Sequence, residues 1–98
     1  MIYHVTTKTL WEQALQMGFY DTPSLASEGF IHNSTEAQVP GVLERYYKNQ
    51  KDLVMLHIDE TKLHPPLRYE LAPSVNEMFP HIFGPINLDA IATVENIK

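Results

Sequence analysis

A chain of 98 residues with 44% hydrophobic and 19% charged content is long enough for one globular domain, residues 1–98, and is unlike a disordered segment. It contains no cysteine, which excludes a disulfide framework, a thiol nucleophile and thiolate metal sites, and which fits a reducing compartment. The net charge is −5 and the seven Lys and Arg residues are thinly spread, so a large nucleic-acid partner is disfavoured while a small anionic ligand stays compatible.

The chain opens on a strand pattern that is followed by a helix pattern. Residues Ile2–Thr6 alternate and predict a short strand, with His4 and Thr6 on one face. The segment Thr9-Leu10-Trp11-Glu12 matches a capping box, in which two side chains satisfy free amides at the start of a helix. Apolar residues at helical spacing then predict a helix over residues 10–17.

The next segment mixes loop, strand and helix signals. Residues 19–29 contain Pro, Ser and Gly and predict a surface loop, and Phe30–Ser34 predicts a second strand. Alternate residues of that strand share one face: Phe30, His32 and Ser34. A second capping box, Thr35-Glu36-Ala37-Gln38, precedes Pro40, which is favourable only in the first turn of a helix. We expect a short turn at 35–38 and a helix over 40–48.

The second half of the chain is dominated by strand patterns. Leu53–Asp59 is a near-continuous apolar run, which indicates a central strand that is covered on both faces. Residues 67–71 alternate and predict another strand, and residues 86–94 predict one or two closing strands. Several strands with only two main helices predict an α+β fold with a small, split and mostly antiparallel β-sheet.

The sequence also carries expectations about location and assembly. No apolar run approaches the roughly 20 residues that a membrane helix requires. The first residues lack the basic and apolar regions of a signal peptide. We therefore expect a cytoplasmic monomer with no membrane association.

Three histidines stand in segments that favour a site. His4 and His32 each lie on a predicted strand among apolar neighbours, and His81 lies in the aromatic, proline-bracketed loop Phe79–Pro85. Imidazole can donate or accept a hydrogen bond and changes charge near neutral pH, so it often binds a ligand or carries a proton. A structural role stays open for His4, as a half-exposed edge-strand residue, and for His81, in a loop that fills a hole in the core.

Other chemistry-bearing residues give weaker signals. Glu28 precedes the strand of His32 by four residues, and Glu70 shares a strand face with Arg68, with which it can pair. Both glutamates are acid–base candidates by proximity alone, and a solvated surface charge is the favoured reading for both. No histidine pair has the i, i+4 spacing of a helical zinc motif, so we expect no metal. No serine lies in a nucleophile-elbow pattern.

Six segments in chain order carry a resemblance: Tyr3-His4-Val5-Thr6, Trp11-Glu12, Ser24-Leu25-Ala26-Ser27-Glu28-Gly29-Phe30-Ile31-His32, Gln38-Val39-Pro40-Gly41, Leu53-Val54 and Phe79-Pro80-His81-Ile82-Phe83-Gly84-Pro85. With them the chain resembles, from Met1 to about Val94, the bacterial family named domain of unknown function 952. That family has no established activity, so the resemblance implies a fold more than a function.

The resemblance implies an ADP-ribosyltransferase-like fold, in which a split sheet opens a cleft that grips NAD. Within that group the chain is distantly similar to RNA 2′-phosphotransferases: Tyr3-His4-Val5-Thr6 resembles their His-Gly-Thr motif, and Phe30–Ser34 their Val-His-Leu-Ser motif. Carried over, His4 would hold the ribose hydroxyls beside the nicotinamide, and His32 would contact the ribose or diphosphate. The cofactor-binding set that we expect comprises His4, Thr6, Tyr20, His32, Ser34, His81 and Phe83, with Phe83 or Tyr20 stacking a ring.

The chain departs from the pattern of those enzymes at three points. Val5 replaces the glycine that lets the cofactor approach the backbone, and Phe30 and Ile31 stand where phosphate-gripping arginines are expected. No glutamate occupies the position of the transferase acid. Activity therefore does not follow from the fold alone.

Three functional hypotheses follow, in order of preference. The first is a cleft that binds NAD or an ADP-ribose-like nucleotide without turnover. The second is a ribosyl or phosphoryl transferase with His4, His32, Glu28 and Glu70 as catalytic residues. The third is a protein-interaction module whose histidines are only structural.

Overall fold

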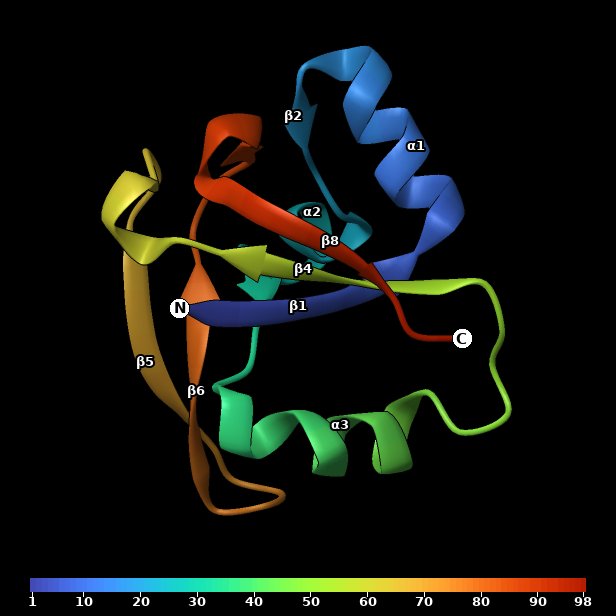
Figure 1. Cartoon of the computed structure of the whole chain (residues 1–98). Helices are drawn as coiled ribbons and strands as arrows, with labels where there is room; N and C mark the ends of the chain where they lie inside the picture. The colour runs from blue at the N-terminus through green and yellow to red at the C-terminus, as the bar shows by residue number, and fades with distance from the viewer.

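Short antiparallel sheets and three α-helices make up the computed structural model, which describes residues 1–98 (Figure 1). One sheet has the order β1-β4-β8, with bounds Ile2–Thr7, Leu53–Ile58 and Ile91–Asn96. A second has the order β3-β6-β5, with bounds Ile31–His32, Glu77–Ile82 and Leu67–Ala72. A two-stranded sheet pairs β2 (Phe19–Tyr20) with β7 (Ile86–Asn87). The α-helices are α1 (Lys8–Met17), α2 (Pro23–Glu28) and α3 (Val39–Tyr46), and the 3₁₀ turns are η1 (Glu36–Gln38), η2 (Glu60–Lys62) and η3 (Leu88–Ala90).

The expected α+β class with antiparallel strands is confirmed, and so is the central place of the strand predicted at Leu53–Asp59. Strand β4 lies between β1 and β8 and ends at Ile58. Four of its side chains are buried: Leu53, Val54, Leu56 and Ile58. An apolar run on both faces is stable only where other elements cover both faces, which a central strand provides.

A single bridge joins the two three-stranded sheets. Tyr3 on β1 and Ser34, just after β3, exchange backbone hydrogen bonds of 2.8 and 2.7 Å. In Figure 1 the β5–β6 pair runs steeply past the end of β1, and α3 lies below β1. The bridge therefore holds His4 and His32 close together although 28 residues separate them.

Helix α1 begins earlier than predicted. It starts at Lys8 rather than at residue 10, because the side chain of Thr7 caps it by accepting from the Leu10 amide at 3.2 Å. The capping role predicted for Thr9 is wrong. Strand β1 continues to Thr7, so the chain turns directly from strand to helix and the first suitable hydroxyl takes the cap.

The surface loop predicted for residues 19–29 is also wrong, since this segment contains β2 and α2. Pro23 occupies the first turn of α2, and Gly29 ends it with a φ of 89°. Pro and Gly are signals for loops, but they are equally favourable at the start and end of a helix. A six-residue helix shows too little apolar periodicity to separate these readings.

The region from residue 30 to residue 48 matches the prediction in type and less well in its bounds. Strand β3 covers only Ile31–His32 rather than 30–34. The second capping box is confirmed, with Thr35 and Gln38 side chains each paired to the other's backbone. The turn η1 follows as expected, and α3 spans Val39–Tyr46 rather than 40–48.

The aromatic loop predicted around His81 is instead strand β6, which lies between β3 and β5. Pro80 cannot donate to a strand ladder, and a proline at such a position favours a loop. Its carbonyl nevertheless accepts from the Asn33 amide at 3.0 Å, and its ring is fully buried. The strand predicted at 67–71 is confirmed as β5, and the closing strands predicted over 86–94 are confirmed as β7 and β8.

Candidate functional site

A cavity of about 630 Å³ opens between the two three-stranded sheets and α3, a volume within the range of small-molecule sites. It is lined by 22 residues, 11 of them hydrophobic. Its walls come from β1, the segment around β3, β6, the end of β5 and helix α3. Segments distant in sequence therefore meet around one hollow, and His4, His32 and His81 all line it.

His4 is buried, and both of its ring nitrogens already have protein partners. Nδ1 donates to the backbone carbonyl of His32, and Nε2 lies 2.7 Å from the Tyr20 hydroxyl. Burial lowers the pKa of His4 to about 4, and the bond to the His32 carbonyl only partly opposes this shift. The ring is therefore neutral at physiological pH. The half-exposed edge residue considered from the sequence is wrong, because His4 is only 8% exposed.

A chain of three polar groups runs inward from His4. The Tyr20 hydroxyl lies 2.7 Å from both His4 Nε2 and Thr6 Oγ1, and burial raises the pKa of Tyr20. Its single proton can serve only one of these neighbours at a time. With a neutral His4 it goes to Nε2, and it goes to Thr6 when Nε2 carries a proton. A ligand could reach Nε2 of His4 only by displacing Tyr20.

His32 presents a different arrangement at the mouth of the cavity. Its Nε2 lies 3.0 Å from Glu28, and the two side chains are 55% and 50% exposed. An ionised carboxylate accepts from Nε2–H, which leaves Nδ1 of the neutral ring as an acceptor. Glu28 is thus the orienting partner of His32 rather than the isolated surface charge that the sequence favoured.

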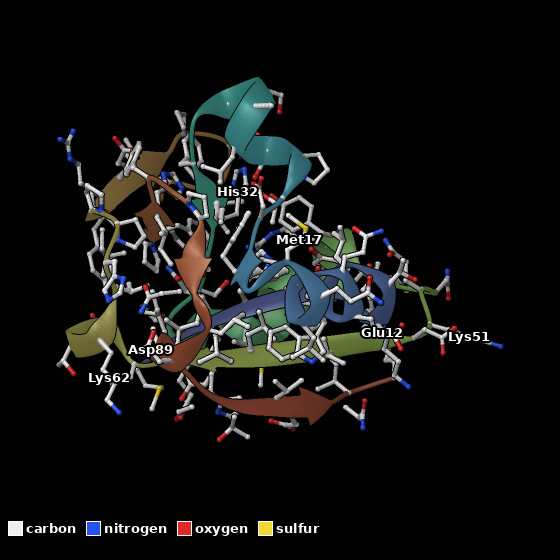
Figure 2. The ribbon with its side chains drawn as sticks, turned by 90° about the horizontal axis from the view of Figure 1, so that it is seen from above. Glu12, Met17, His32, Lys51, Lys62 and Asp89 are labelled. Carbon is white, nitrogen blue, oxygen red and sulfur yellow. The ribbon has the colours of Figure 1, made fainter.

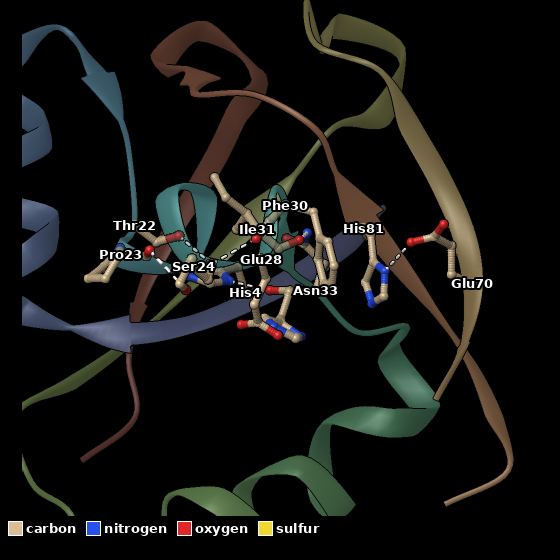
Figure 3. A network of polar contacts seen from close by, with 12 residues as sticks. His4, Thr22, Pro23, Ser24, Glu28, Phe30, Ile31, Asn33, Glu70 and His81 are labelled. Carbon is tan, nitrogen blue, oxygen red and sulfur yellow. Dashed lines mark hydrogen bonds and ion pairs between the residues drawn. The ribbon is translucent and has the colours of Figure 1, made fainter. Parts of the chain in front are cut away.

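His81 repeats the carboxylate pair from the neighbouring strand. Its Nδ1 lies 2.8 Å from Glu70, and Phe30 stacks on the ring at 4.0 Å between centroids (Figure 3). The rings of His81 and His32 are 5.5 Å apart. The alternative that Glu70 pairs with Arg68 is wrong, because the Arg68 guanidinium lies over the ring of Phe83, 5.4 Å from its centroid.

The remaining predicted residues divide between the cavity and its surroundings. Thr6, Tyr20 and Ser34 line the cavity. Glu28, Glu70 and Phe83 do not line the cavity. The two glutamates pair with His32 and His81, and the ring of Phe83 lies 5.7 Å from that of Phe30 between centroids. Tyr20 is fully buried in a T-shaped pair with His4, so its ring is not free to stack on a ligand.

The sequence did not identify several residues that line the cavity. The aromatic walls include Tyr3, Tyr46, Tyr47 and Phe79. Asn33 is buried, donates to the Ile31 carbonyl at 2.9 Å, and leaves its Oδ1 without a partner. Two adjacent tyrosines at the end of α3, Tyr46 and Tyr47, were a usable signal, whereas nothing in the local pattern marks Asn33. No three His, Asp or Glu side chains gather closely enough to hold a metal ion.

Comparison with solved structures identifies the fold. The crystal structure of protein CC0527 from Caulobacter crescentus has a TM-score of 0.89 at 22% identity and covers 99% of this chain and 85% of that one. The solution NMR structure of CC0527 has a TM-score of 0.85 at 22% identity, with coverages of 99% and 84%. At this identity the likeness concerns the fold.

Three further findings complete the description. No helix is both long and apolar enough to cross a membrane. Among curated proteins none matches this chain. The family model described as "Protein of unknown function (DUF952)" matches residues 5–94, and the chain therefore belongs to that family.

Proposed function

We propose that the protein binds an NAD-like or ADP-ribose-like nucleotide in the histidine-lined cavity. The observation that carries the proposal is the meeting of three imidazole-bearing segments around one hollow of about 630 Å³. Aromatic side chains provide faces for a flat ring, and neutral polar groups provide hydrogen bonds that fix its orientation.

The free ring nitrogens assign the ligand contacts. Nδ1 of His32 and Nε2 of His81 have no protein partner, whereas both nitrogens of His4 are occupied. His32 and His81 are therefore the residues that bind ligand hydroxyls or ring nitrogens. His4 acts as a positioning residue, because its Nδ1 donates a hydrogen bond to the backbone carbonyl of His32.

Calorimetry with ADP-ribose and NAD tests this proposal. We expect saturable binding that weakens by about tenfold in His32→Asn or His81→Asn, because each variant removes one oriented hydrogen bond. His57→Asn is the matched control: His57 also pairs with a carboxylate, Glu95 at 2.8 Å, but does not line the cavity. No binding of either nucleotide at millimolar concentration would refute the proposal.

A second candidate function is proton-transfer chemistry on the same ligand. It is favoured by two imidazoles that are each oriented by a carboxylate, an arrangement suited to a general base. In transfer from NAD, the bond between nicotinamide and C1′ breaks and neutral nicotinamide leaves with the electron pair. An acceptor hydroxyl bonds to C1′ and gives its proton to an imidazole. Nicotinamide release that is no faster than in a His32→Ala/His81→Ala variant, across several acceptors, removes this candidate.

A further inference from the structure

The charges around the cavity distinguish between parts of a nucleotide. None of the lining side chains is Lys, Arg, Asp or Glu, so the cavity surface consists of apolar groups, hydroxyls, one amide and three imidazoles. A phosphate that enters such a hollow loses its hydration shell. It would find no guanidinium or ammonium group there to replace the lost water.

Three carboxylates are hydrogen-bonded to lining residues without lining the cavity themselves. Glu28 lies 3.0 Å from His32, Glu70 lies 2.8 Å from His81, and Glu36 accepts from the Tyr3 hydroxyl at 3.3 Å. The groups bonded to these lining residues are therefore acidic rather than basic, and they disfavour an anion that reaches the histidines.

The cations of the chain lie outside the cavity lining. Figure 2 shows Lys51 and Lys62 well away from His32, toward other ends of the molecule. Arg45 and Arg68 lie over aromatic rings, those of Tyr46 and Phe83. The aromatic walls, by contrast, suit a flat ring that is neutral or positively charged.

We infer that the cavity takes a nucleoside, neutral or cationic, and that any phosphate of the ligand stays outside it. This inference rests on the proposed function and names the part of the nucleotide that the site recognises. His32 and His81 bind the ribose hydroxyls or ring nitrogens. The carboxylates behind them, Glu28 and Glu70, act as specificity determinants against phosphate.

Calorimetry on two matched ligand pairs tests the inference: adenosine against AMP, and nicotinamide riboside against its 5′-phosphate. We expect each nucleoside to bind at least as tightly as its phosphate. A phosphate that binds tenfold or more tightly than its nucleoside, with an affinity that falls with salt, overturns the inference and leaves the proposed function standing. Binding by none of the four ligands, nor by ADP-ribose or NAD, removes both.

Charge-removing variants sharpen the result. In Glu28→Gln and Glu70→Gln the amide can still pair with the imidazole, and AMP should gain about threefold in affinity relative to adenosine because one repulsive charge is gone. Glu95→Gln makes the same change in net charge beside His57 and outside the cavity, and should leave the ratio unaltered. A ratio that stays constant in both cavity variants overturns the role of the carboxylates.

Discussion

Two classes of histidine meet in this molecule, and their hydrogen bonds separate them. His4 is buried with both nitrogens bonded to protein groups, whereas His32 and His81 each have one nitrogen on a carboxylate and one nitrogen without a protein partner. A fully bonded ring can only hold the fold in shape, while a half-bonded ring can also meet a ligand. The number of unoccupied ring nitrogens, more than burial, therefore indicates where a ligand can be recognised.

The largest effect that separates the two classes is expected for His4→Ala. This change removes a buried ring and two hydrogen bonds, so we expect the free energy of unfolding to fall by about 4 kcal/mol. Urea unfolding followed by the fluorescence of Trp11, the only tryptophan, measures it. A loss of less than about 1 kcal/mol in the free energy of unfolding would show that His4 does not belong to a separate, structural class of histidine.

Acid should destabilise the protein through the same residue. The pKa of His4 is lowered from 6.5 to about 4, so between these values the unfolded chain holds a proton that the folded protein lacks. The stabilisation is complete above pH 6.5 and is lost as the pH falls toward 4. We expect unfolding to cost about 3 kcal/mol less at pH 4 than at pH 7 from this group. In His4→Gln, this part of the pH dependence should vanish.

Removing the partner of His4 should have a smaller effect. Tyr20→Phe keeps the buried ring but leaves Nε2 of His4 without a donor, which should cost about 2 kcal/mol. Thr6→Val serves as the comparison, because Tyr20 then keeps its bond to His4; about 1 kcal/mol is expected. Equal losses in both variants would mean that the bond to His4 has no special weight.

The smallest change in stability is expected at His32. Its pair with Glu28 is exposed, and exposed pairs contribute at most about 1 kcal/mol. His32→Asn should therefore change the free energy of unfolding, measured by urea, by less than about 0.5 kcal/mol. The same variant should weaken nucleotide binding. A variant that loses stability and affinity in parallel would place His32 with His4 and end the distinction between the two classes.

The sequence was sufficient for the elements with long and regular patterns. The continuous apolar run of β4 predicted its central place, and the capping box at Thr35 predicted the entry to α3. It failed where two rules compete at one residue. Pro23 marks either a loop or a first helical turn, and Pro80 argues against a strand that the tertiary contacts of its ring and carbonyl support.

The candidate site was predictable in its residue types and not in their roles. His4 and His32 both stood out as polar rings in apolar strands, and the structure places both at the cavity. That both nitrogens of His4 are occupied depends on Tyr20 and on the carbonyl of His32, contacts that no local pattern encodes. The pair between Glu70 and His81 depends in the same way on the register of β5 against β6.

The bridge between Tyr3 and Ser34 has a mechanical consequence. One pair of backbone hydrogen bonds connects the β1 edge to the segment after β3, and the cavity lies along that seam. Bending between the two sheets would be concentrated at this point and would widen or narrow the hollow while each ladder stayed intact. Hydrogen exchange at the Ser34 amide therefore reports directly on the opening and closing of the cavity.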